Sequence, residues 1–224
     1  MKNLVLLAGG LLLGALLVSS PAMAQTTTTP STLADLIADN ALGGFQIQDK
    51  IFSDFVYTPT NTTHDAAANI AATPIFITLG PSQDQHGWSF NYKGGSWAND
   101  FSLSYKISVA PEYPIVFIVS SKDQIFGGQT GSALPSAVDT QSSGGLLGVL
   151  NLDNLTGAGQ TQSLFFSPVR FVTTSSVVSV GEHGMASYEQ NWFETTVGVP
   201  EPSMLLLLGF GLVGIAGFKR NIKK

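Results

Sequence analysis

Residues 101–109 read FSLSYKISV, and this stretch decides the fold. Its apolar residues alternate strictly with three serines and a lysine. A period of two is typical of a β-strand that has one face on a hydrophobic core and the other in water. The stretch therefore predicts a half-buried strand of an antiparallel sheet.

Weaker strand signals lie on both sides of this segment, separated by Gly, Pro, Asn and Asp. They cover residues 45–48, 51–57, 75–79, 88–92, 115–119, 164–166, 169–173, 177–180 and 192–197. Short strands at this spacing are typical of antiparallel sandwiches. We expect an all-β domain that forms an antiparallel β-sandwich, with a barrel as the alternative. The Gly- and Ser-rich residues 127–148 are expected to form a long loop, although residues 146–152 could form a strand.

One short helix is expected before the first strand. Thr32 and Asp35 have the spacing of a capping box, in which each side chain accepts from a free backbone amide at the start of a helix. The pattern predicts a helix over residues 32–40 that ends before Gly43 and Gly44.

The first 24 residues read as a signal peptide. Lys2 supplies a positive charge, residues 4–18 are apolar, and Ala22 and Ala24 are small residues at the positions that signal peptidase reads. We expect cleavage after Ala24. The alternative is a retained anchor helix, but the apolar run is short for a membrane span of about 20 residues.

The C-terminus carries a second apolar segment, which a Pro-Glu-Pro triplet precedes and a basic cluster follows. Pro200, Glu201 and Pro202 precede apolar residues 204–218. The prolines oppose helix formation and keep the triplet extended, as a processing enzyme requires. As a helix, the apolar residues would reach roughly 22 Å, short of a hydrocarbon core of about 30 Å. The segment suits either a single pass of a thin membrane or a sorting signal that is cut off. Four basic residues follow the apolar segment, and in a membrane they would remain on the cytoplasmic side: Lys219, Arg220, Lys223 and Lys224.

The triplet, the apolar segment and the basic end, in this order, resemble the PEP-CTERM sorting domain of Gram-negative bacteria. The resemblance implies recognition by an exosortase, a membrane-embedded enzyme similar to cysteine transpeptidases. It also implies a secreted or surface protein of a bacterium that makes exopolysaccharide, as in a biofilm. The chain then divides into a signal peptide (1–24), a flexible leader (25–31), a β-sandwich ectodomain (32–190), a tether (191–199) and the sorting segment (200–224).

Composition limits the function. The chain of 224 residues has 10 Lys and Arg against 15 Asp and Glu, a net charge of −5. This balance argues against nucleic acid as a partner. The chain has no Cys, which excludes disulfides, thiol catalysis and thiolate metal sites.

No residue pattern predicts a cofactor. The three histidines are His64, His86 and His183; they are far apart in the sequence, and we expect them on solvated loops rather than on zinc. Aspartates at expected turns could hold a structural calcium ion, but no DxDxDG loop occurs. They are Asp84, Asp100, Asp123, Asp139 and Asp153.

These observations predict an exported, non-catalytic surface or matrix protein. The alternative is a carbohydrate-binding module for exopolysaccharide, which would use exposed aromatic residues. The candidate aromatics are Trp88, Tyr92, Trp97 and Tyr113, although aromatics of a sandwich usually lie in the core. A secreted hydrolase is the third reading, and neither a GxSxG elbow nor an identifiable acid pair supports it.

Overall fold

Two antiparallel sheets form the domain in a computed structural model, which describes residues 29–80, 83–127, 134–153, 160–182 and 184–196. The six-stranded sheet has the order β1 (Phe45–Ile47), β2 (Lys50–Pro59), β5 (Phe101–Val109), β10 (Phe171–Ser179), β7 (Ser136–Ser142) and β8 (Leu146–Asp153). The five-stranded sheet has the order β3 (Ile70–Gly80), β4 (Gln83–Tyr92), β11 (Ser187–Thr196), β6 (Val116–Phe126) and β9 (Gln160–Val169).

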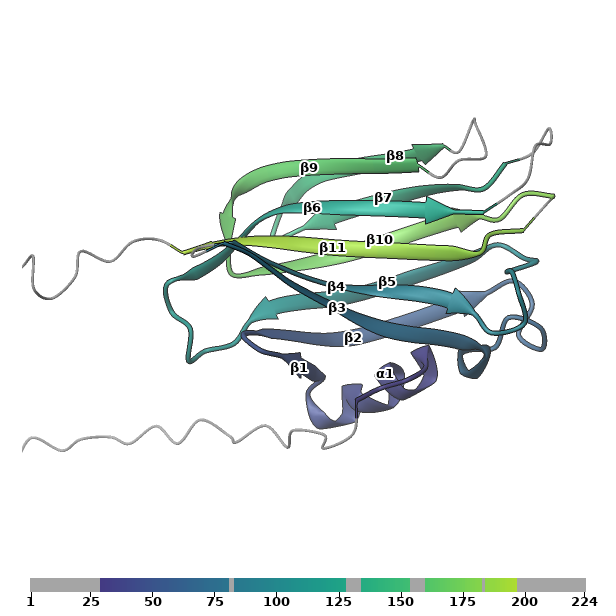
Figure 1. Cartoon of the computed structure of the whole chain (residues 1–224), viewed down its shortest axis with the longest axis horizontal. Helices are drawn as coiled ribbons and strands as arrows, with labels where there is room; N and C mark the ends of the chain where they lie inside the picture. Colours follow the sequence, from purple (N-terminus) through teal and green to yellow (C-terminus); the bar gives the residue numbers. More distant parts are fainter. Residues whose placement is uncertain (1–28, 81–82, 128–133, 154–159, 183, 197–224) are drawn as a thin grey trace, which may run out of the picture.

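The sheets stack face to face with their strands roughly aligned, as is usual for sandwiches. Figure 1 looks through both layers, so that β9, β6, β11, β4 and β3 overlie β8, β7, β10, β5 and β2. The strand order of each sheet is open in the described residues, with β1 and β8 at the edges of one sheet and β3 and β9 at the edges of the other. The predicted β-sandwich is therefore confirmed, and the barrel alternative is wrong.

The alternation in residues 101–109 is confirmed in β5. Its five apolar side chains are buried, and the polar residues between them are half-exposed. β5 pairs with β2 on one side and β10 on the other, so its buried face lies in the middle of the core.

The core has an aromatic half and a polar half. In the aromatic half, the ring of Trp88 packs edge-on against Phe52, and Phe55 stacks on Tyr105 with 4.7 Å between ring centroids. The polar half consists of hydrogen-bonding side chains with no solvent exposure, among them Asp123, Asp139, Gln141, Ser176 and Gln190.

The capping box is confirmed at the start of α1 (Leu33–Asp39). The Asp35 amide donates to Thr32 Oγ1 at 3.1 Å, and the Thr32 amide donates to Asp35 Oδ2 at 2.9 Å. α1 packs against β2 and β3 through Leu33 and Leu36, and so covers the edge of the sandwich. Two 3-10 turns, η1 (Asn40–Leu42) and η2 (Ala67–Asn69), complete the non-strand elements of the described residues.

Two expectations about boundaries are corrected. The expected loop at residues 127–148 contains β7, because Asp139 and Gln141 of that strand point into the polar half of the core, where polar residues are compatible with a buried strand. The expected tether begins too early, since residues 191–196 belong to β11 in the middle of the five-stranded sheet. The end of the leader is also packed: Pro30 is buried, and Ser31 O accepts from the Ala72 amide.

Two neighbouring residues of β5 test which side chains of this strand face the core and which face solvent. Leu103 is 1% exposed and Ser104 points to solvent. Leu103→Ala leaves a cavity, and we expect it to lower the free energy of unfolding by about 2–5 kcal/mol. Ser104→Ala should change it by less than about 0.5 kcal/mol. Urea unfolding of both variants measures the difference, and equal effects would contradict the assignment.

Candidate functional site

The outer face of the five-stranded sheet carries the best candidate binding surface. The strand register aligns one row of side chains across all five strands. Residues paired across neighbouring strands point to the same face of a sheet. From β3 to β9, this row consists of Ile77, Gln85, Phe193, Ser120 and Phe165.

The row contains an exposed aromatic platform. Phe165 is 80% exposed, the highest value among the large apolar side chains of the described residues. It lies near Phe193, because both residues pair with Ser120 of β6. A surface cleft of about 240 Å³ runs along this part of the sheet. Its lining includes Gln83, Ser120, Ser163, Phe165 and Phe193.

The next row places a buried amide, that of Asn191, beside the platform. It places Asn191 between Gly87 and Lys122. A Cβ at Gly87 would lie 2.2 Å from the backbone oxygen of Gln190 and 2.8 Å from Asn191 Oδ1, so glycine lets the backbone of β11 and this amide approach β4 closely. Gln85 Nε2 donates to the same oxygen at 2.7 Å. The close approach thus fixes an amide pair beside the two phenylalanines.

The face is nearly neutral. A third row carries Glu189, whose carboxylate accepts from Ser89 Oγ at 3.1 Å, and the second row carries Lys122. The other outward polar groups near them are amides and hydroxyls, such as Gln124, which donates to Thr161 Oγ1. Amides and hydroxyls both donate and accept hydrogen bonds, which matches the hydroxyl groups of a sugar.

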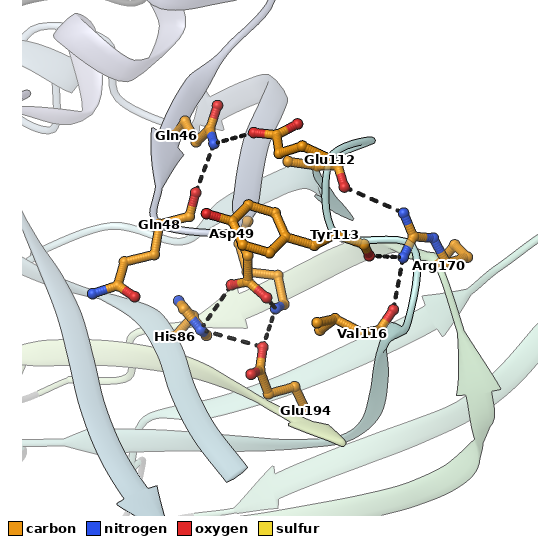
Figure 2. A network of polar contacts seen from close by, with 11 residues as sticks. Gln46, Gln48, Asp49, His86, Glu112, Tyr113, Val116, Arg170 and Glu194 are labelled. Atoms are coloured by element: carbon orange, nitrogen blue, oxygen red, sulfur yellow. Dashed lines mark hydrogen bonds and ion pairs between the residues drawn. The ribbon is translucent and has the colours of Figure 1, made fainter. Parts of the chain in front are cut away.

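Beneath this sheet lies a buried cluster of charged side chains, defined by Asp49, Lys50, His86 and Glu194. Figure 2 shows Asp49, His86 and Glu194 pointing toward one another. Lys50 is 1% exposed, and its Nζ contacts both Glu194 Oε2 and Asp49 Oδ2, the latter at 2.7 Å. His86 Nε2 lies 3.2 Å from Asp49 Oδ1 and 3.5 Å from Glu194 Oε2.

The backbone brings the cluster together from both sheets. Asp49 lies in the two-residue turn between β1 and β2, and Lys50 is the first residue of β2. His86 comes from β4, and Glu194 follows the β-bulge of β11 and β6. The turn residue Gln48 has φ 53°, a left-handed conformation that a side chain rarely adopts.

The two acids of the cluster respond differently to burial. Burial raises the pKa of Asp49, and the nearby Lys50 ammonium offsets only part of this effect. Burial acts in the same direction on Glu194, but its interactions with His86 and Lys50 prevail and lower its pKa to about 2. The two neighbouring carboxyls thus have pKa values shifted in opposite directions, upward for Asp49 and downward for Glu194.

The cluster resembles a metal site in its ligand types only. Asp49, His86 and Glu194 offer ligand atoms within 4.8 Å of one another. The Lys50 ammonium contacts both carboxylates, however, and so supplies the positive charge that a metal ion would bring.

A second buried group joins the sheets in the polar half of the core. Gln141 Nε2 donates to Asp123 Oδ2 of β6 at 3.5 Å, and Tyr188 Oη donates to Asp139 Oδ1 of β7 at 2.6 Å. Burial raises the pKa of both acids, and the charge of Asp139 raises that of Asp123 further. Because both carboxyls are fully buried, they have no access to a substrate.

The structure corrects several sequence-based assignments. His86 is 0% exposed and not in a solvated loop, because β4 turns it into the core. His64 is exposed as expected, and His183 lies outside the described residues. Asp123 and Asp139 lie in strands rather than at turns.

The expected aromatic candidates do not form the platform. Trp88 and Trp97 are buried, as core aromatics should be, and Tyr92 and Tyr113 lie away from the cleft lining. Sequence reasoning missed Phe165 because LFF at residues 164–166 does not show which aromatic faces outward. It missed Lys50 because a single lysine at the start of a strand is normally solvated.

The predicted signal peptidase site (Ala22, Ala24), the sorting triplet (Pro200, Glu201, Pro202) and the basic cluster at residues 219–224 lie outside the described residues. β11 ends at Thr196, and residues 197–199 separate it in the sequence from the triplet that begins at Pro200. A protein-sorting motif matches residues 198–221. The chain carries a PEP-CTERM sorting motif.

The PEP-CTERM motif implies export, processing by an exosortase and sorting to the cell surface. No helix among the described residues has the length and apolar character to cross a membrane. No curated protein matches the chain.

Among the solved structures to which the chain is similar are carbohydrate-binding modules. The module TmCBM61, solved with beta-1,4-galactotriose, has a TM-score of 0.37 at 8% identity, over 65% of this chain and 90% of that one. The mannan-recognising module TmCBM27 has a TM-score of 0.29 at 10% identity, over 66% and 99% of the two chains. A family 32 module of C. perfringens NanJ, solved with galactose, has a TM-score of 0.27 at 17% identity, over 62% of this chain and 99% of that one. Similarities this low do not relate the binding residues of those modules to residues of this chain.

The buried acid pair predicts an unusual pH dependence of stability. An unfolded Asp ionises near pH 4, at about 3.9. Because the folded pKa of Asp123 is raised, its contribution is complete below the unfolded pKa and is lost as pH rises through the folded pKa. Asp123→Asn cannot ionise and can donate to Asp139. We therefore expect its urea midpoint to fall less between pH 5 and pH 8 than that of the wild type.

Asp153→Asn, at the exposed end of β8, is the matched control and should keep the wild-type pH dependence. If the wild type and Asp123→Asn show the same dependence, the acid pair does not titrate in this range.

Proposed function

We propose that this chain is an exported, non-catalytic surface protein whose sandwich binds an uncharged polysaccharide. The sorting motif supports the location. The observation that carries the binding proposal is the row with Phe165 and Phe193, in which one exposed ring and one half-buried ring lie along a cleft that Gln83 and Ser163 also line. An aromatic ring can pack on the apolar face of a sugar ring, and a few well-placed polar groups give orientation.

The charge of the face supports an uncharged ligand. Lys122 and Glu189 offset each other on the sheet, and the described residues offer no basic patch there for an anionic polymer. Specific retention would therefore depend on stacking and on neutral hydrogen bonds.

The cleft is less suited to hydrolysis. Glycoside hydrolysis uses two carboxyl groups that flank the bond, roughly 5–10 Å apart. Glu194 is the one acid among the described residues that line the cleft, and Lys50 and His86 already engage it. A non-catalytic role follows as part of the proposal.

Phe165→Ala tests the binding surface. The full chain is assayed by affinity electrophoresis in gels that contain exopolysaccharide from its own cells or a panel of uncharged polysaccharides. Loss of the most exposed ring should weaken binding at least about tenfold, which corresponds to ~1.4 kcal/mol. Leu146→Ala is the matched control, because Leu146 is 70% exposed but lies on β8 of the other sheet. Unchanged retention of Phe165→Ala in a gel that retards the wild type would refute the assigned surface.

Replacement of Pro200, Glu201 and Pro202 by alanines tests the sorting route independently of any ligand. We expect the wild type to lose residues beyond the triplet and the variant to keep its C-terminus to Lys224. Intact masses of protein from membrane, surface and medium fractions measure this difference. Both forms should begin at Gln25, and a variant that matures normally would show that the triplet is not the processing signal.

A further inference from the structure

The buried cluster joins the beginning and the end of the folded domain. Lys50 begins the second strand of the chain, and Glu194 lies near the end of the last strand; 144 positions separate them. One residue belongs to the six-stranded sheet and the other to the five-stranded sheet. Their side-chain contact is therefore a bridge between the two layers.

The surroundings of this contact are set up for acid–base chemistry. The Lys50 amine has carboxyl groups on two sides and is shielded from water, with an exposure of 1%. Asp49 lies 2.7 Å from the amine, and its Oδ1 has no hydrogen bond of good geometry among the described residues. Both ring nitrogens of His86 are buried and equally lack one. Buried polar atoms normally have hydrogen-bond partners, so this concentration of unsatisfied groups needs an explanation.

We propose that Lys50 and Glu194 condense to an amide, which forms an isopeptide cross-link between β2 and β11. Lys50 Nζ gives a proton to the Asp49 carboxylate, which passes it to Glu194, and the neutral amine attacks Cδ of the resulting carboxylic acid. The N–Cδ bond forms, one Cδ–O bond breaks, and Asp49 passes the second proton lost by the nitrogen to the departing oxygen. An ammonium and a carboxylate become one amide and one water, so atoms and charge balance.

Each neighbour has a stated role in this step. A lysine amine is a nucleophile only when it is deprotonated, and an adjacent base activates it. The raised pKa of Asp49 suits a group that accepts and returns protons. His86 Nε2, 3.5 Å from Glu194 Oε2, stabilises the negative charge that develops on that oxygen.

The amide product would stabilise the folded domain in two ways. Two buried charges carry a desolvation cost of several kcal/mol each, and an amide removes both. A cross-link that closes a long loop also restricts the unfolded chain most strongly. The chain has no Cys with which to form a disulfide, and the sorting motif begins directly after β11. A covalent tie at Glu194 connects this strand to the opposite sheet.

Peptide mapping of the full chain tests the proposal. The protein is denatured, digested with trypsin and analysed by tandem mass spectrometry. We expect no cleavage after Lys50 and a branched peptide that joins the segment around Lys50 to the segment after Arg170, lighter by one water than its two parts. Recovery of two linear peptides, with normal cleavage after Lys50, would overturn the proposal.

Two variants assign the roles. Lys50→Arg keeps the positive charge but cannot condense, so it should give linear peptides only. Asp49→Asn keeps the size of the side chain but removes the base, and we expect at least a tenfold lower yield of the branched peptide. An undiminished yield would remove Asp49 from the mechanism. If a variant does not fold, the wild-type map decides by itself, because it is made on denatured protein.

Discussion

The inward face of β11 holds the two layers of this sandwich together. Every second residue of the strand reaches a polar partner on the opposite sheet: Tyr188 donates to Ser176 and Asp139, Gln190 to Thr174 and Ser176, and Trp192 to Tyr105. Glu194 continues the series with Lys50. Sheets usually pack through apolar side chains alone, whose contacts carry little directional information. Here one strand specifies how its sheet lies on the other, because each hydrogen bond requires one partner in one position.

Such a core depends on the polar pairs that cross between the sheets. A buried polar group without a partner costs about 1–3 kcal/mol. A shift of β11 by two residues would remove the hydrogen-bond partners of several buried groups at once. The aromatic half of the core, with Trp88, Phe52 and Phe55, supplies the non-directional burial that favours collapse. The polar half then selects one register among the collapsed arrangements. This division matters in a chain that has no disulfide to enforce its topology.

The same strand connects the core to both functional features. Its outward residues Asn191 and Phe193 belong to the candidate binding face, and the sorting motif follows its last residue, Thr196. The alternation of the strand turns Phe193 to the cleft and Glu194 to the buried cluster. A load on the attached end would therefore act first on the strand with the most connections to the opposite sheet. Rigidity at this point suits a domain that presents a flat face outside the cell.

Sequence patterns determined the local features of this protein. Alternation predicted β5, the Thr32–Asp35 spacing predicted the capped helix, and the order of triplet, apolar segment and basic end predicted the sorting motif, because each signal is complete within a short stretch. Only the tertiary structure decided which polar residues are buried. Asp123, Asp139, His86 and Lys50 read as solvated groups in sequence, since their partners lie on strands far along the chain. The register of five strands likewise decided that Phe165 and Phe193 share a row. The burial of these polar residues and the shared row of the two phenylalanines both depend on pairing between distant strands. Such pairing leaves no periodic pattern in the sequence.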